Sequence, residues 1–110
     1  MAEQRPTIPC GRYDWERMIR EERMDRSTKL VALVFASFAN VKGEGIFPGN
    51  DQLAYAACMS LATLKRNRDA LVRTGWLTKV KHGNRHRGLS DEWRLSMPDL
   101  LEHREDWASA

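Results

Sequence analysis

The stretch NDQLAYAACMSLATLKRNRDALVRTGWL, residues 50–77, decides the fold. It predicts two helices separated by a tight turn. Asn50 or Asp51 can cap the first helix, because Asn and Asp side chains accept hydrogen bonds from the first unpaired backbone amides. One face of this helix is apolar and carries Leu53, Ala54 and Ala57.

The second predicted helix begins after Ser60 and ends at Gly75. The Ser60 side chain can accept a hydrogen bond from the amide of Thr63, and Gly75 can take the left-handed conformation that often ends a helix. Near-helical spacing predicts a buried face of Leu61, Leu64, Leu71 and Val72. The opposite face carries Ala62, Thr63, Lys65, Arg66, Asn67 and Arg73. Two helices, a short turn and a cationic second helix form a helix-turn-helix arrangement.

Positive charge is concentrated around this second helix. The chain of 110 residues has a net charge of +3. Residues 60–89 alone hold eight Lys and Arg against one acid, Asp69, whereas residues 1–59 are balanced and residues 90–110 are net acidic. Such a run of charge is usually just a face that is exposed to solvent. Its coincidence with the helix-turn-helix pattern instead favours a surface for a polyanion.

Length and composition predict one globular domain in the cytoplasm, associated with the nucleoid. No apolar run approaches the roughly 20 residues that span a bilayer, and the N-terminus lacks the apolar core of a signal peptide. Cys10 and Cys58 do not make a disulfide framework. The sequence has no Gly-rich phosphate loop, nucleophile elbow or zinc-ligand spacing. We therefore expect no enzymatic activity, cofactor, metal, small-molecule ligand or membrane partner.

The flanking segments predict an arm and further helices. Residues 1–12 read as a flexible N-terminal arm, and residues 13–97 as the domain itself. The amphipathic residues 14–24 predict a helix that packs on its own domain or, alternatively, on a second subunit. Ser27 or Thr28 can cap an apolar helix that follows. Pro98 can start a last helix over residues 98–107 within the tail 98–110, and this helix is a second candidate for a dimer contact.

Two short strands are predicted after the second motif helix. Residues 76–81 alternate apolar and polar side chains, and residues 92–95 predict the returning strand. A basic, Gly-bounded turn over residues 82–89 separates them. A hairpin with a basic loop directly after the second helix is typical of a winged helix. The predicted fold class is therefore mainly α with a small β-hairpin (α+β), with additional N-terminal and C-terminal helices.

The string over residues 47–77 resembles the winged helix-turn-helix domains of bacterial, plasmid and phage regulators and replication proteins. The shared pattern comprises Phe47-Pro48, Leu53-Ala54, Ser60, Thr63-Leu64, Arg66, Leu71 and Gly75-Trp76-Leu77. The resemblance covers roughly residues 27–95 and implies this fold together with DNA binding. Arg68 departs from the pattern, because such helices often carry an apolar residue there.

The resemblance implies that the second helix enters the major groove, where each base pair has its own pattern of donors and acceptors. We expect base reading by Ala62, Thr63, Arg66 and Asn67, with Arg66 on guanine and Asn67 on adenine. Contacts to phosphates are expected from Ser60, Thr63, Lys65 and Arg73. The wing is expected to follow the backbone or minor groove through Lys81, His82, Asn84, Arg85, His86 and Arg87.

The predicted function is that of a dimeric, sequence-specific regulator of transcription that binds double-stranded DNA. One alternative is a replication or partition factor of a plasmid, phage or other mobile element that binds iterated sites. A third hypothesis is a protein-interaction module that has a winged-helix fold. A regulator predicts one or two sites at a promoter, a replication factor predicts an array, and an interaction module predicts weak affinity that is indifferent to sequence.

Replacing Lys81 and Arg85 together by Ala should weaken binding to all DNA sequences alike. Loss of two phosphate contacts should also flatten the dependence of log K on log salt concentration, by about 0.9 per contact. Titrations of a selected duplex and a random duplex at several salt concentrations measure both effects. A loss confined to one DNA sequence would contradict a backbone role for the wing.

Overall fold

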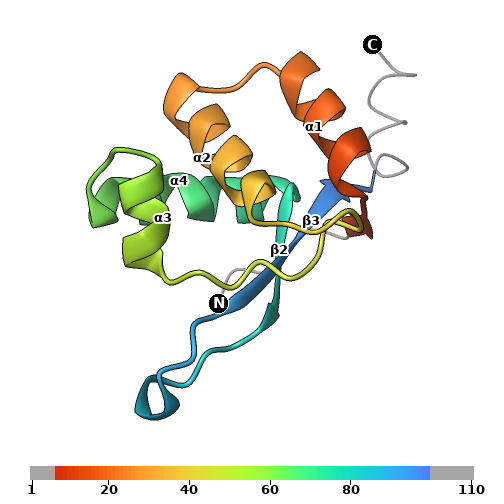
Figure 1. Ribbon diagram of the computed structural model, residues 1–110. Coiled ribbons are helices and arrows are strands. Elements are labelled where there is room, and N and C mark those ends of the chain that lie inside the picture. Colours follow the sequence, from red (N-terminus) through yellow and green to blue (C-terminus); the bar gives the residue numbers. More distant parts are fainter. Residues whose placement is uncertain (1–6, 100–110) are drawn as a thin grey trace.

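The computed structural model describes residues 7–99, with the exception of the Arg85 side chain. Within this range the chain forms four α-helices and three strands (Figure 1). In order, the elements are β1 (Thr7–Pro9), α1 (Arg12–Glu21), α2 (Arg26–Ser37), α3 (Asn50–Ala56), α4 (Leu61–Thr74), β2 (Leu77–Lys81), a 3₁₀ turn (Arg85–Arg87) and β3 (Glu92–Pro98). No helix in this range is long and apolar enough to cross a membrane.

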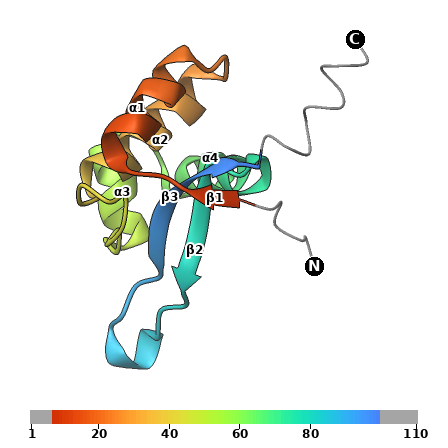
Figure 2. The ribbon, with the colours of Figure 1, turned by 90° about the vertical axis from the view of Figure 1, so that its right-hand side faces the viewer.

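The three strands form an antiparallel sheet in the order β1-β3-β2. Leu77 lies opposite Leu95 and Lys79 opposite Trp93, and the register shifts between Lys79 and Lys81. The loop that joins β2 to β3 extends away from the helices, as Figures 1 and 2 both show. Helix-turn-helix and hairpin thus make an α+β winged helix, and the predicted fold class is confirmed.

One apolar core joins the helices to the sheet. Its largest buried side chains include Trp15 of α1, Phe35 of α2 and Leu95 of β3. The Trp15 indole N–H donates to the carbonyl oxygens of Ser96 at 2.8 Å and Trp76 at 3.0 Å. Burial of Tyr- and Trp-type rings is favourable when the polar edge finds such partners. The apolar side of α1 therefore packs on its own domain, which was one of the two alternatives for this helix.

The predicted ends of α4 are confirmed. The Ser60 Oγ accepts a hydrogen bond from the Thr63 amide at 3.2 Å, and Gly75 has a φ of 91°. The predicted caps of the two preceding helices are wrong. Gly49 and Asp25 occupy the cap positions of α3 and α2, without side-chain capping bonds. Asn50 and Thr28, which were predicted as possible caps, instead make hydrogen bonds to α4.

Both predicted terminal segments need correction. The arm predicted over residues 1–12 already contains β1, which pairs with β3, and α1 begins at Arg12. Backbone pairing across the sheet orders this stretch even though its sequence is short and contains Pro9. Pro98 does not start a helix, because it ends β3 and lies opposite Thr7. Residues 1–6 of the predicted arm and residues 100–107 of the predicted helix 98–107 lie outside the described residues, as does the rest of the tail, 108–110.

Gly75→Ala should lower the free energy of unfolding more than Gly88→Ala does. Both positions have positive φ, at 91° and 67°, and that conformation costs an L-residue roughly 1–2 kcal/mol. Only at Gly75 would the added Cβ also crowd another residue, since it would lie 3.1 Å from the Cα of Pro98; at Gly88 nothing lies within 4 Å. Urea unfolding of the two variants measures the difference. Equal losses would mean that the close approach of Pro98 contributes nothing.

Candidate nucleic-acid interface

α4 exposes to solvent part of the positive charge that is concentrated in residues 60–89. Its inner side packs on α2 and α3 and buries Leu64, Asn67 and Leu71. Figures 1 and 2 together place α4 on the side of the helical layer that faces away from the viewer of Figure 1. The outer side exposes Leu61, Ala62, Arg66, Asp69 and Arg73. We call these five residues the outer face of α4.

Asn67 is not available to read adenine, so that prediction is wrong. Its side chain is on the inner side of α4, and the residue is only 7% exposed. The Thr28 hydroxyl donates to Asn67 Oδ1 at 2.8 Å, and Asn67 Nδ2 donates to the Thr63 carbonyl at 2.9 Å. The predicted buried stripe was rotated from the true one, because it included Leu61, which is 38% exposed.

Four of the predicted DNA-contacting residues of α4 lie on or beside its outer face. Ala62, Arg66 and Arg73 lie on the outer face, with the partly exposed Lys65 beside them. Among the residues that the structure describes, neither Arg66 nor Arg73 has an ion-pair partner. Two cationic side chains thus extend into solvent from one helix face.

Ser60 and Thr63 shape the start of α4. The Ser60 Oγ accepts from the Thr63 amide and also lies 2.9 Å from the Thr63 hydroxyl, to which it donates. These bonds engage the Ser60 hydroxyl within the cap. Both residues lie at the helix N-terminus, where the helix dipole and the unpaired amides favour anions such as phosphate.

Arg68 occupies a position where winged helix-turn-helix domains often carry an apolar residue. Its side chain bonds within the domain, which accounts for a charged residue at this position. Its guanidinium carbon lies 5.4 Å from the centroid of the Trp93 ring, a distance that allows a cation–π interaction. Nη1 donates to Asn50 Oδ1 at 3.0 Å. Nε and Nη2 both donate to Asp69 Oδ1, at 3.1 and 3.0 Å. The Arg68 side chain is only 14% exposed, so it joins α4 to α3 and β3 rather than extending toward a ligand.

The base of the wing is held by a second set of charged contacts. Lys79 Nζ lies 5.2 Å from the Trp93 ring centroid and 3.2 Å from Asp91 Oδ2. Asp91 Oδ1 accepts a hydrogen bond from the Gly83 amide at 2.7 Å. Burial raises the pKa of the Asp91 carboxyl, but the Gly83 amide, Lys79 and the nearby His82 lower it by more, so its pKa lies below the ordinary value. The carboxylate is therefore ionised at neutral pH and ties the two strands together.

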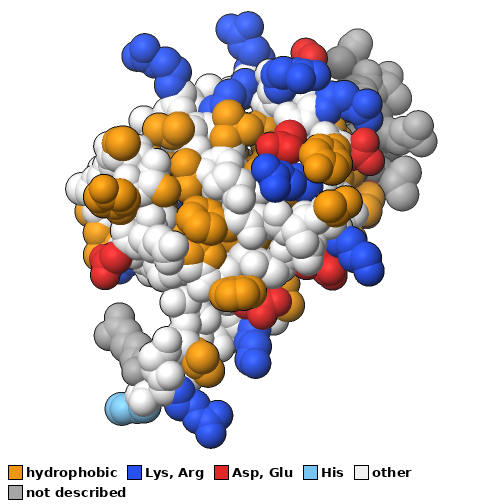
Figure 3. Space-filling model, viewed as in Figure 1, with side chains coloured by type: hydrophobic (Ala, Val, Ile, Leu, Met, Phe, Trp, Pro, Cys, Tyr) orange, Lys and Arg blue, Asp and Glu red, His pale blue; other side chains and the backbone are white. Residues whose placement is uncertain are grey.

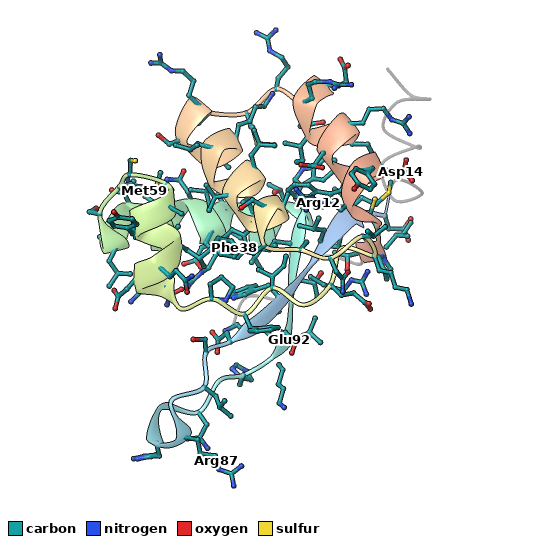
Figure 4. The ribbon with its side chains drawn as sticks, in the orientation of Figure 1. Arg12, Asp14, Phe38, Met59, Arg87 and Glu92 are labelled. Atoms are coloured by element: carbon teal, nitrogen blue, oxygen red, sulfur yellow. The ribbon has the colours of Figure 1, made fainter. Side chains whose placement is uncertain are left out.

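The wing loop carries the other predicted residues. Asn84 pairs with Leu89 across the loop, and its Oδ1 accepts from the His86 amide at 3.0 Å. Asn84 thus shapes the turn from which the basic residues extend. The exposed Lys, Arg and His side chains described in the loop and at its entrance are those of Lys81, His82, His86 and Arg87. Figure 4 shows Arg87 at the far end of the wing. Arg85 lies in the 3₁₀ turn.

Asp69 is a candidate that the sequence reasoning missed. It lies on the outer face of α4 with its side chain 55% exposed. The helical spacing of Ala62, Arg66, Asp69 and Arg73 was a sufficient signal, because residues three and four apart share a helix face. Among the described residues, no three His, Cys, Asp or Glu side chains form a group that could hold a metal ion.

Comparison with known proteins is consistent with this geometry. A family model described as a helix-turn-helix domain matches residues 22–77. This span includes α2, α3 and α4 and ends where β2 begins. No curated protein and no solved structure matches the chain significantly.

Arg66→Ala should weaken binding to the preferred DNA site and leave the fold intact. Arg66 is exposed on the outer face of α4, and a bidentate contact to guanine provides about 1–3 kcal/mol of discrimination. Affinities for the preferred duplex and for duplexes with single base-pair changes measure that discrimination, and thermal unfolding checks the fold. Arg23→Ala, which removes an exposed cation between α1 and α2, is the matched control. Unchanged selectivity in Arg66→Ala would refute base reading by this residue.

Proposed function

The chain belongs to the helix-turn-helix domain family, and from that premise we propose that it is a sequence-specific transcriptional regulator that binds double-stranded DNA. The observation that carries the proposal is the presence of two exposed basic surfaces on one domain that shares a single core. One is the outer face of α4, and the other is the wing loop between β2 and β3. The proposed activity is binding, without catalysis.

In the proposed complex, α4 lies in the major groove. Ala62 and Arg66 face the bases, with Ala62 against a thymine methyl group and Arg66 on guanine. Lys65, Arg73 and the helix N-terminus at Ser60 and Thr63 contact phosphates. The wing lies along the neighbouring backbone or minor groove and contributes Lys81, His82, Asn84, Arg85, His86 and Arg87.

We further propose that two copies bind together, because one small module makes few contacts and paired half-sites multiply affinity. Trp15 and Ile19, on the apolar side of α1, are buried in the domain's own core, so an α1 contact would use the exposed side with Tyr13. Leu30 and Leu33 of α2 are 44% and 40% exposed. Figure 3, which views the domain from the side opposite α4, shows hydrophobic side chains gathered over the helices. A contact there leaves α4 and the wing open to DNA.

The replication or partition alternative uses the same DNA-binding surface, so the arrangement of sites on DNA distinguishes it from the regulator. Selection of binding sites from a random duplex pool, followed by footprinting of the DNA around the gene at about physiological salt, makes the comparison. We expect one or two protected pseudo-palindromes near a promoter. A regular array of protected sites would instead support replication or partition.

A pool from which no sequence is enriched over random DNA would overturn the proposal. It would favour the third hypothesis, a protein-interaction module, because nonspecific affinity that vanishes at moderate salt reflects charge alone. Arg66→Ala, carried through the same selection, serves as a comparison, because it should keep the fold and lose one proposed base contact on the outer face of α4.

A further inference from the structure

Asp69 is an acid in the middle of a basic, outward-facing surface. It is the one Asp or Glu among residues 60–89. Ala62, Arg66, Asp69 and Arg73 follow one another at intervals of four, three and four residues, so they form a row along the outer face of α4. If α4 lies in the major groove, Asp69 lies between the two cations that approach the DNA.

A carboxylate in this position opposes binding to phosphates. Like charges repel, and nonspecific affinity for DNA depends on cations that neutralise phosphates. The same carboxylate favours one base, because Asp and Glu accept a hydrogen bond from the N4 amino group of cytosine in the major groove. An acid at this position therefore lowers general affinity and raises selectivity.

The Asp69 carboxylate is held in place by bonds that engage one of its oxygens. Oδ1 accepts from both Nε and Nη2 of Arg68. Arg68 is itself fixed by Asn50 Oδ1 and by the ring of Trp93. Among the residues that the structure describes, Oδ2 of Asp69 has no hydrogen-bond partner. Two carboxylate oxygens together offer about four acceptor positions, so Oδ2 remains able to accept a bond from outside the protein.

Asp69 has a simpler role to be weighed against this one. Arg68 is mostly buried, and a buried guanidinium needs an anionic or polar partner. As a counter-ion alone, Asp69 would contribute to stability and would leave base preference unchanged. A counter-ion does not need to be exposed on the outer face, however, whereas the Asp69 side chain is 55% exposed there.

We propose that Asp69 is a specificity determinant that accepts a hydrogen bond from the amino group of a cytosine, and that Arg68 is the residue that positions it. This inference rests on the proposed function, in which α4 binds DNA. Arg68, which contacts Asn50 and Trp93, holds the Asp69 carboxylate in place before DNA binds. The contact with cytosine therefore costs little side-chain entropy.

Asp69→Asn tests the proposal by changing the acceptor into a carboxamide of the same shape. In selections from a random duplex pool, one position of the preferred site should lose its cytosine and become indifferent or favour adenine, which Asn recognises. The wild-type preference for cytosine at that position should be roughly tenfold. Affinity for random DNA should rise, because the variant removes a negative charge from the binding face. Asp14→Asn makes the same charge change on α1, where Figure 4 labels Asp14, and should leave the preferred site unaltered.

Arg68→Met tests the positioning role. Met keeps apolar cover over Trp93 and removes both hydrogen bonds to Asp69. The same base-pair position should lose its preference although Asp69 is still present, and Arg68→Lys should restore part of it. A purely structural role for Arg68 would lower stability and leave the relative affinities at that position unchanged.

A change on the DNA side keeps the test independent of how the variants fold. Replacing the cytosine by 2-pyrimidinone, which lacks the amino group, should weaken wild-type binding roughly tenfold and leave Asp69→Asn binding nearly unchanged. A wild-type site in which every preference for cytosine survives in Asp69→Asn, or equal losses for the two proteins on 2-pyrimidinone, would overturn the assignment of Asp69 while leaving DNA binding in place. If the wild-type protein selects no sequence at all, the proposed function itself fails.

Discussion

Trp93 of β3 connects the helices α2 and α4 to the sheet and to the base of the wing. It is only 3% exposed, and its backbone exchanges hydrogen bonds with Ile46 at 2.7 and 3.2 Å. Its ring meets Phe35 of α2 edge to face, with centroids 5.9 Å apart. The cations of Arg68 on α4 and Lys79 on β2 both lie within 5.5 Å of the ring centroid, at 5.4 and 5.2 Å. One side chain of the sheet therefore touches the second motif helix and the wing at once.

This arrangement matters because, in the proposed complex, the outer face of α4 and the wing loop contact one duplex together. The wing hairpin directly follows α4 in the chain. Trp93 and the Lys79–Asp91 ion pair set the position of the wing relative to α4. A surface that is already ordered loses less conformational entropy on binding. The same contacts hold Arg68, and through Arg68 they hold the Asp69 carboxylate on the outer face. Packing inside the domain thus determines which groups are held on the proposed DNA-binding face.

Local signals in the sequence were enough to predict both motif helices, the ends of α4 at Ser60 and Gly75, and the hairpin. Which side of α4 is buried was harder to predict from the sequence. Leu61 is apolar, which suggests the core, and Asn67 is polar, which suggests the surface, but Leu61 is exposed and Asn67 is buried. The partner that makes burial of Asn67 favourable is Thr28, which is 39 residues away. β1 was missed for a similar reason, since Thr7–Pro9 is ordered by pairing with β3 at the other end of the domain. Contacts between distant segments decided each of these cases.

The measurement that tests the account most directly is a map of amide chemical shifts of the full chain as a selected DNA duplex is added. The account predicts that the largest changes cluster in residues 60–74 and in the wing, residues 81–91. Changes centred on α1 and the exposed side of α2, with α4 unaffected, would contradict the assignment of α4 as the helix that reads DNA.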